Sequence, residues 1–202
     1  MSLRLGIVVL AAGFGRRYGE GNKLHQLLDG RPVLAWTLAA LSRLPATSAI
    51  AVLAPDDALA AALALEAGFT PVPNPARATG MGGSIACGMR ALSDEVDAVL
   101  IALGDMPRVT HSSLEALLAA FSTRDHIVVP SFEGRRGHPV VFGARYFGAL
   151  RQLGGDTGAR EILKQHAALV REVPVNDPGV LLDVDTPQDL AGAASGLPRA
   201  PT

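Results

Sequence analysis

The sequence is poor in cysteine and in aromatic residues, and it carries no excess of one charge. Cys87 is the single cysteine among 202 residues, so no disulfide can form within the chain, and a reducing compartment fits. The 18 lysines and arginines are balanced by 19 aspartates and glutamates. This balance provides neither a basic surface for nucleic acid nor an acidic tail, so we expect no polyanionic partner.

Long hydrophobic runs are also missing. The apolar stretch 3–10 has the length of a signal-peptide core, but it is shorter than a membrane span and continues directly into a glycine-rich turn. It is therefore predicted to be a strand. No other segment is long enough to span a membrane, so we expect a cytoplasmic protein without a membrane partner.

Aliphatic residues dominate what is present. Hydrophobic residues make up 49% of the chain and aromatic residues only 4%, so the core must be built from Ala, Val, Leu and Ile. Such a core suits helices that pack on buried strands. The length suits one domain, expected over residues 1–195, with a frayed tail at 196–202.

Short apolar runs alternate with stretches rich in helix-forming residues. The runs lack polar alternation, which indicates strands buried on both faces. The predicted strands are 5–10, 49–53, 98–102 and 127–129, and the predicted helices are 32–41, 57–66, 84–92 and 110–121. Pro32 suits a first helical turn and Thr110 an N-cap. The alternation predicts an α/β fold with a mostly parallel sheet, whose ligands bind at the carboxyl ends of the strands.

The regular alternation breaks after Pro130. Residues 131–145 contain the turn Gly137-His138-Pro139 ahead of an apolar Val-Val-Phe run, which predicts a hairpin or loop leading into a further strand. We expect a small inserted lobe at this point. A helix over 161–166 and a strand over 170–175 are predicted to follow.

A glycine-rich turn with cations follows the first predicted strand. After Leu10-Ala11-Ala12-Gly13-Phe14-Gly15 come Arg16, Arg17 and, further on, Lys23. Small residues let backbone N–H groups approach phosphate oxygens, and the cations supply countercharge to a triphosphate. The pattern favours a nucleoside triphosphate site. The alternative is a tight strand-to-helix turn whose arginines lie in water.

Acidic residues occupy two positions suited to a metal. Asp105 directly follows the predicted strand 98–102, where a carboxylate faces the ligand crevice, and Mg²⁺ prefers one or two carboxylates together with phosphate oxygens. Asp183 and Asp185 alternate along an extended segment and point the same way, with Asp185 the stronger candidate. The alternative for Asp105 and Asp185 is that each caps a turn or helix.

The loop over residues 74–84 is rich in small residues and is predicted to open the helix 84–92. Its backbone amides and the Ser84 hydroxyl can contact a base, a ribose or a phosphate. A flexible connection with Ser84 as N-cap is the alternative.

Six motifs in this order resemble the MobA/MocA-like nucleotidyltransferases, with the molybdenum cofactor cytidylyltransferase branch closest. They are the glycine-rich turn with Lys23, Gly80-Met-Gly-Gly-Ser, Gly104-Asp-Met-Pro, Gly137-His-Pro-Val, Gly155-Asp-Thr-Gly-Ala-Arg and Asp183-Val-Asp-Thr-Pro. The resemblance covers the chain from about Leu5 to Asp189. It implies a Rossmann-like three-layer fold, with the inserted lobe on the acceptor side.

The resemblance also implies a reaction. A nucleoside monophosphate passes from a nucleoside triphosphate to a terminal phosphate, pyrophosphate is released, and Mg²⁺ takes part. In the cytidylyltransferase branch the acceptor is molybdopterin, and a molybdenum hydroxylase is a possible recipient of the product. The turn has Ala11-Ala12-Gly13 where guanylyltransferases of the MobA type usually have two glycines, which favours CTP over GTP.

Residue roles follow from the same resemblance. Arg17, Lys23 and Asp105 are the expected catalytic residues, and Asp105 and Asp185 the expected metal ligands. Acceptor binding is expected of His138, Asp156 and Arg160, although His138 can instead stabilise its turn. The expected nucleotide-binding residues are Leu10, Ala11, Ala12, Gly13, Gly15, Arg16, Lys23, Asn74, Gly80, Gly82 and Ser84.

Other functions stay open at this point. A guanylyltransferase using GTP, or a cytidylyltransferase for an isoprenoid or sugar phosphate, shares much of the pattern. From other classes, an NAD(P)-dependent oxidoreductase is suggested by Gly13-Phe14-Gly15, but Gly19 comes one residue late for that fingerprint. A non-enzymatic protein that binds a nucleotide or delivers a cofactor is a further alternative.

Overall fold

The computed structural model describes residues 3–13 and 21–195. In this part of the chain an eight-stranded sheet has the order β10-β7-β9-β6-β1-β4-β5, and β8 pairs with β7 at its side. Its strands are β1 (Leu5–Ala11), β4 (Ala46–Leu53), β5 (Thr70–Pro73), β6 (Ala98–Leu103), β7 (Ile127–Phe132), β8 (Arg135–Arg136), β9 (Val140–Gly143) and β10 (Val170–Pro174). Two further strands, β2 (Leu27–Leu28) and β3 (Arg31–Pro32), form a small antiparallel hairpin.

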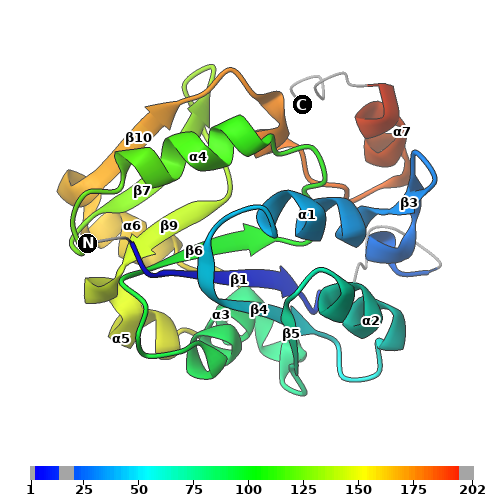
Figure 1. Cartoon of the computed structure of the whole chain (residues 1–202), viewed down its shortest axis with the longest axis horizontal. Coiled ribbons are helices and arrows are strands. Elements are labelled where there is room, and N and C mark those ends of the chain that lie inside the picture. The colour runs from blue at the N-terminus through cyan, green and yellow to red at the C-terminus, as the bar shows by residue number, and fades with distance from the viewer. Residues whose placement is uncertain (1–2, 14–20, 196–202) are drawn as a thin grey trace.

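Helices connect the strands and cover both faces of the sheet (Figure 1). They are α1 (Val33–Leu41), α2 (Ala58–Glu66), α3 (Gly80–Ala91), α4 (His111–Ala120), α5 (Phe147–Arg151), α6 (Arg160–Gln165) and α7 (Pro187–Ser195). Short 3-10 helices are η1 (Lys23–His25), η2 (Arg77–Thr79), η3 (Ala144–Tyr146), η4 (Ala167–Leu169) and η5 (Pro178–Leu181). None of the helices in the described residues has the length and apolar run needed to cross a bilayer.

The predicted α/β architecture is confirmed, and most predicted elements appear within a few residues of their expected bounds. Thr110 is the N-cap of α4 and accepts a hydrogen bond from Ser113 N, as expected. Pro32 lies at the N-cap of α1 rather than in its first turn. The helix expected from Ser84 instead begins at Gly80, so the prediction of Ser84 as an N-cap is wrong.

The segment 131–145 departs from the expected inserted lobe. β9 enters the main sheet between β6 and β7 and pairs antiparallel with both, with Val141 opposite Leu100 and Val128. Every residue of β9 is buried, because its apolar side chains are covered on both faces of the sheet. The end of β7 also pairs antiparallel with the short strand β8, which forms a hairpin at the side of the sheet.

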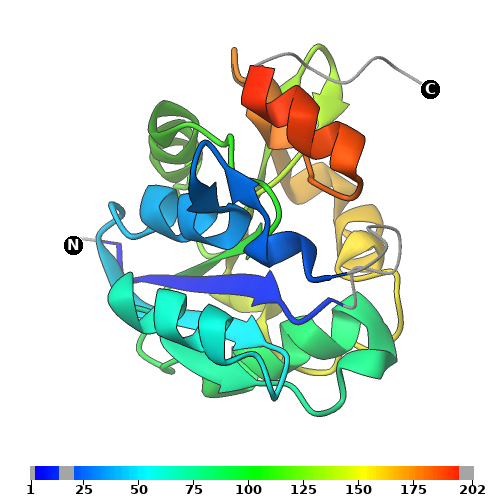
Figure 2. The same ribbon diagram turned by 90° about the vertical axis from the view of Figure 1, so that its right-hand side faces the viewer.

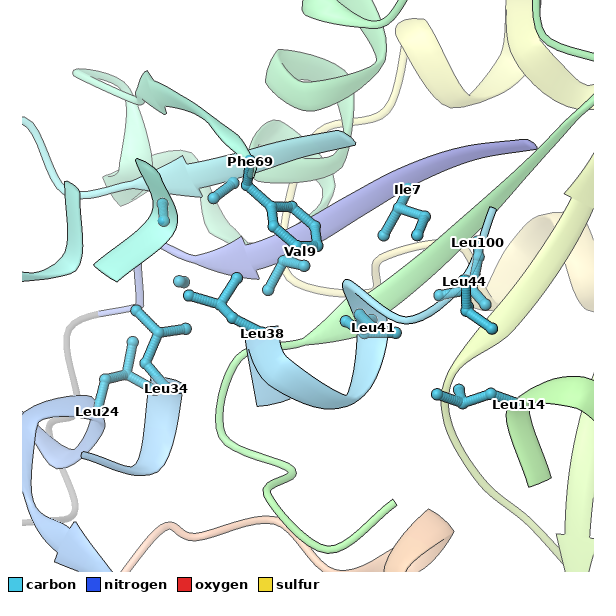
Figure 3. Close-up of a cluster of buried hydrophobic side chains, with 14 of the residues drawn as sticks. Ile7, Val9, Leu24, Leu34, Leu38, Leu41, Leu44, Phe69, Leu100 and Leu114 are labelled. Carbon is cyan, nitrogen blue, oxygen red and sulfur yellow. The ribbon is translucent and has the colours of Figure 1, made fainter. Parts of the chain in front are cut away.

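Two hydrophobic cores separate the three layers. On one face Ile7 and Val9 of β1 pack with Leu34 and Leu38 of α1 and with Leu114 of α4, as Figure 3 shows. The other face carries α3, α5 and α6 on residues such as Val8 and Val52 of the sheet. Alternate residues of β1 therefore contribute to opposite cores, as the period of a strand requires.

Helix α3 lies unusually close to the sheet at Gly88. A Cβ built on Gly88 would come within 2.5 Å of Val8 Cγ1 and 2.9 Å of Val52 Cγ2, so a larger residue there would push the helix outward. β1 runs parallel to β4 and β6, which brings their carboxyl ends to one edge of the sheet. In Figure 2 the carboxyl end of β1 points toward the side on which α3 and α6 lie.

Asp177 ties the segment after β10 to the start of α4. Its buried carboxylate accepts hydrogen bonds from the Thr110 N–H, the Thr110 and Ser113 hydroxyls, and the Gly179 N–H, at 2.7 to 2.9 Å. The side chain thereby caps η5 and fixes it against α4. η5 leads directly into residues 182–186, so Asp177 determines where that acidic segment lies.

We predict that Asp177→Ala lowers the free energy of unfolding by about 3 kcal/mol. The substitution leaves several buried donors unsatisfied, each of which costs about 1 to 3 kcal/mol before the structure relaxes. Urea unfolding followed by circular dichroism measures the change. Asp125→Ala is a control, since this exposed carboxylate makes only a surface ion pair with Arg145, and a loss of less than about 0.5 kcal/mol is expected. Equal losses of unfolding free energy in both variants would contradict the stabilising role assigned to Asp177.

Candidate active site

A cavity of about 430 Å³ opens at the carboxyl ends of β1 and β6 and reaches the start of α3. This is the edge at which ligands bind in open α/β sheets. Polar, charged and small apolar residues from segments far apart in the sequence share its wall. The lining residues are Leu10, Ala11, Ala12, Gly13, Lys23, Leu24, Arg77, Ala78, Gly80, Met81, Ser84, Leu103, Asp105, Asp156, Asp183 and Asp185.

The turn after β1 forms one wall of this cavity. Leu10 to Gly13 all line it, and Ala11 and Ala12 are buried, at 3% and 2% exposure. A Cβ on Gly13 would meet no atom of the described residues within 4 Å. Gly15, Arg16 and Arg17, which were predicted to continue this site, lie outside the described residues.

Lys23 lies between two carboxylates that come from distant parts of the chain. Its Nζ is 2.5 Å from Asp105 Oδ2 and 2.6 Å from Asp185 Oδ1, and both contacts are hydrogen-bonded ion pairs. All three side chains are at least 84% covered. The structure thus brings together three of the residues that the sequence singled out.

The electrostatic environment keeps Lys23 charged. Burial lowers the pKa of Lys23, but the charges and hydrogen bonds of Asp105 and Asp185 outweigh this effect and raise the pKa above its ordinary value. A permanent positive charge therefore lies inside the cavity at neutral pH. Asp183 also lines the cavity, and burial together with the charges of Asp185 and Asp105 raises its pKa.

The backbone fixes the two aspartates that flank Lys23. Asp105 follows β6, and its carbonyl oxygen accepts a hydrogen bond from Val184 N at 2.9 Å, which joins the two acidic segments. Asp189 accepts hydrogen bonds from the backbone N–H groups of Asp185 and Thr186. The Thr186 hydroxyl in turn accepts from Asp189 N, so Thr186 and Asp189 form a capping box at the start of α7. This capping leaves the Asp185 carboxylate to face Lys23.

The carboxylates offer oxygen donors for a hard divalent cation. Asp105 Oδ1 is buried and has no hydrogen-bond partner among the described residues. In residues 3–13 and 21–195 no three His, Cys, Asp or Glu side chains are arranged as a metal-binding group. The donor set therefore fits a cation held by one or two protein carboxylates and completed by phosphate oxygens and water, as is usual for Mg²⁺.

The predicted contact residues within 74–84 have different positions relative to the cavity. Gly80 and Ser84 line the cavity, whereas Asn74 is 2% exposed and lies behind them. Asn74 donates from Nδ2 to Ser84 Oγ at 3.1 Å and accepts from Ala76 N, so it supports the loop from beneath. Gly82 N donates to Gly155 O at 2.8 Å, which ties this loop to the segment containing Asp156.

The three residues expected at the acceptor lie at different distances from the cavity wall. Asp156 lines it, Arg160 is the exposed first residue of α6, and His138 is not among the lining residues. Burial lowers the pKa of His138, the nearby Asp105 opposes this shift, and Arg160 adds to it. His138 N donates to Val180 O, and His138 Nδ1 is buried without a partner in the described part of the chain.

Three residues that sequence reasoning missed form a hydrogen-bonded group next to Lys23 in the chain. Asn22 and His25 each donate a hydrogen bond to the carboxylate of Asp57, and Asp57 is the N-cap of α2. Asp57 stands after β4, a strand that ends at the same sheet edge as β1. This position in the sequence could have indicated a site residue, but the sequence analysis predicts Asp57 only as the first residue of a helix.

Comparisons with known proteins agree with this geometry. A family model described as the MobA-like NTP transferase domain matches residues 7–170. A phosphoenolpyruvate guanylyltransferase of Mycolicibacterium paratuberculosis is 33% identical over 187 residues, which cover 91% of this chain and 79% of that protein. A nicotine blue oxidoreductase of Paenarthrobacter nicotinovorans is 30% identical over 194 residues, 91% of this chain and 93% of the other. The match to the purine catabolism protein PucB of Bacillus subtilis, 36% identical over 114 residues, spans only 54% of either chain.

Solved structures agree in fold. The Mycobacterium sp. strain JC1 homologue of the Mycobacterium tuberculosis protein Rv0371c has a TM-score of 0.79 and 28% identity, covering 96% of this chain and 98% of its own. A nucleotidyl transferase of Methanothermobacter has a TM-score of 0.81 at 20% identity over 96% and 98% of the two chains. The fold and the resemblance expected from the motifs are both confirmed, and the chain belongs to the MobA-like NTP transferase domain family, as a nucleotidyltransferase.

Proposed function

We propose that this nucleotidyltransferase transfers CMP from CTP to the terminal phosphate of molybdopterin and releases pyrophosphate. The observation that carries nucleotidyl transfer is the placement of Lys23 between Asp105 and Asp185, inside a cavity at the carboxyl ends of β1 and β6. A buried cation next to two carboxylates is what a metal-bound triphosphate requires.

The choice of CTP rests on the turn after β1. In Ala11-Ala12-Gly13, Ala12 stands where guanylyltransferases of the MobA type usually have glycine, and it lines the cavity. Relatives named as cytidylyltransferases support the choice. One is the 2-C-methyl-D-erythritol 4-phosphate cytidylyltransferase of Gloeobacter violaceus, 29% identical over 192 residues, 88% of this chain and 82% of that protein. Molybdopterin as acceptor is inferred from the order of the six motifs.

The chain's own residues account for most of the proposed chemistry. An ionised acceptor phosphate needs no deprotonation before an oxygen attacks the α-phosphorus, so no general base is required. Lys23 neutralises charge on the pyrophosphate that leaves, and backbone N–H groups of the turn after β1 orient the phosphate chain. Asp105 and Asp185 would hold Mg²⁺. When bound, this ion supplies Lewis-acid stabilisation of the negative charge on the phosphate oxygens.

The acceptor is expected on the side of Asp156. This residue lines the cavity on the segment that contacts Gly82, whereas Lys23 and the turn after β1 form other parts of the wall. We assign Arg160 and His138 to the outer part of the acceptor path. The neutral state that burial favours in His138 suits a hydrogen-bond donor to a phosphate rather than an ion-pair partner.

A second candidate is an oxidoreductase that binds a dinucleotide. It is favoured by the relative named nicotine blue oxidoreductase, which aligns along 91% of this chain. Guanylyl transfer to another phosphate acceptor is the corresponding alternative within nucleotidyl transfer, since one relative is named as a phosphoenolpyruvate guanylyltransferase. Nucleotidyl transfer requires a nucleoside triphosphate, whereas the oxidoreductase requires a dinucleotide. Binding experiments with both kinds of ligand can therefore separate the two functions.

We predict that Lys23→Ala and Asp105→Asn each lower pyrophosphate release at least about a hundredfold, because each removes a charge placed for the phosphates or their metal. Both variants should still fold and unfold in one cooperative transition, although the loss of an ion-pair partner lowers the unfolding midpoint. A coupled assay with CTP, Mg²⁺ and molybdopterin measures the rate. Lys164→Ala is the matched control, because Lys164 is an exposed lysine paired only with Glu161. Near-normal rates in Lys23→Ala or Asp105→Asn would remove the role assigned to that residue.

We also predict Mg²⁺-dependent stabilisation by CTP above that by GTP, ATP, UTP or NAD. A ligand at a hundred times its Kd adds roughly 2.7 kcal/mol, which raises the unfolding midpoint of a domain of this size by several degrees. Thermal unfolding of the purified protein with each nucleotide, with and without Mg²⁺, measures the shift. Stabilisation by GTP alone would transfer the proposal to guanylyl transfer, and stabilisation by NAD alone would replace it with the oxidoreductase.

A further inference from the structure

Three polar side chains hold the backbone around Lys23 and take no part in the chemistry above. Asn22 precedes η1, His25 ends it, and both bind Asp57, which lies more than 30 positions further along the chain. We name Asn22, His25 and Asp57 the Asp57 clamp. It joins the connection between β4 and α2 to the short helix that carries Lys23.

The contacts of the clamp converge on one buried carboxylate. Asp57 Oδ2 accepts from Asn22 Nδ2 at 2.8 Å, and Asp57 Oδ1 accepts from His25 Nε2 at 2.8 Å. Because a carboxylate can only accept, the Nε2 of His25 must carry the hydrogen. Asp57 Oδ1 also accepts from Ala60 N at 2.9 Å as the N-cap of α2. The Asp57 side chain is only 6% exposed, so water competes little for these bonds.

The clamp restrains the backbone on both sides of Lys23. Asn22 Oδ1 accepts from Leu24 N at 3.0 Å, and the Asn22 carbonyl accepts from His25 N at 3.0 Å. The Leu24 side chain is 3% exposed and packs in the core beneath α1. Only the rotamers of its own side chain are then left to vary the position of Lys23 Nζ.

We propose that Asp57 is a positioning residue for Lys23: through Asn22 and His25 it holds η1 so that Lys23 Nζ reaches the space between Asp105 and Asp185. The expected effect on the rate rests on the proposed nucleotidyl transfer. The expected effect on the position of Lys23 does not depend on that function. A long, flexible lysine side chain needs a fixed origin to place one charge against a phosphate chain. The alternative is that Asp57 only caps α2.

The chain offers a direct test, because Lys23 and Lys164 are its only two lysines. The Lys23 side chain is 13% exposed and ion-paired, and that of Lys164 is 73% exposed. An acylating reagent followed by peptide mass spectrometry measures the modification rate of each, with Lys164 as internal reference. The measurement needs no substrate. It therefore tests the clamp even if the wild-type protein releases no pyrophosphate, an outcome that would contradict the proposed function alone.

The variant Asp57→Ser separates positioning from capping, since serine is a good N-cap but is too short to reach Asn22 and His25. We expect Lys23 modification to accelerate toward the Lys164 rate. We also expect kcat for pyrophosphate release to fall about tenfold or more, while KM for the nucleotide changes less than about threefold. The matched control is Asp56→Ser, which removes the same charge from an exposed neighbour and should change neither quantity.

Asn22→Ala and His25→Ala leave the α2 cap intact and should each accelerate Lys23 modification, which keeps the test decisive if Asp57→Ser fails to fold. Unchanged Lys23 modification in the folded variants would overturn the proposal. The same holds if Asp57→Ser lowers only the unfolding midpoint, because Asp57 would then be a helix cap and nothing more.

Discussion

The ion pairs of Lys23 with Asp105 and Asp185 are the interaction on which the candidate site depends. The two carboxylates come from the end of β6 and from the segment before α7, and they would repel each other because both are largely covered from solvent. One ammonium group neutralises part of this charge and holds both segments next to η1. Removing one partner of a covered pair leaves the other charge uncompensated, which is why the arrangement constrains its surroundings so strongly.

The structure around these ion pairs uses acidic residues in two different ways. Asp177 and Asp189 are buried and accept hydrogen bonds from backbone N–H groups, so they shape the chain between β10 and α7. Asp183 and Asp185 lie between them in sequence and face the cavity. Asp177 and Asp189 thereby orient the segment between them so that Asp183 and Asp185 face the cavity that contains Lys23. A rigid frame of this kind lets charges stay where a triphosphate needs them without reorganisation during the reaction.

Sequence patterns predicted the layers of the fold because the buried strands and the helices have distinct periods and lengths. They also located Lys23, Asp105 and Asp185, since each follows or precedes an element in a recognisable motif. They named Asp183 and Asp185 as candidate metal ligands but gave Asp177 and Asp189 no role, because the hydrogen bonds that a buried carboxylate accepts depend on what surrounds it in the fold. The Asp57 clamp was missed for a related reason: a helix N-cap and a long-range hydrogen-bond acceptor look identical in sequence. The insertion of β9 into the main sheet was not predicted because one of its two partners, β6, lies far from it along the chain.

The close contact between the first turn of α3, residues 80–82, and the segment 154–156 links the two substrate sides of the proposed reaction. A Cβ on Gly80 would lie 2.2 Å from Asp156 Oδ1, and one on Gly82 would lie 2.5 Å from Gly154 O, so glycine is required at both positions. The hydrogen bond from Gly82 N to Gly155 O holds the two segments together. The start of α3 and Asp156, which we propose face the nucleotide and the acceptor respectively, are therefore held against each other. In-line transfer of a phosphoryl group demands a fixed distance between attacking and leaving oxygens, and a shared wall of this kind can maintain it.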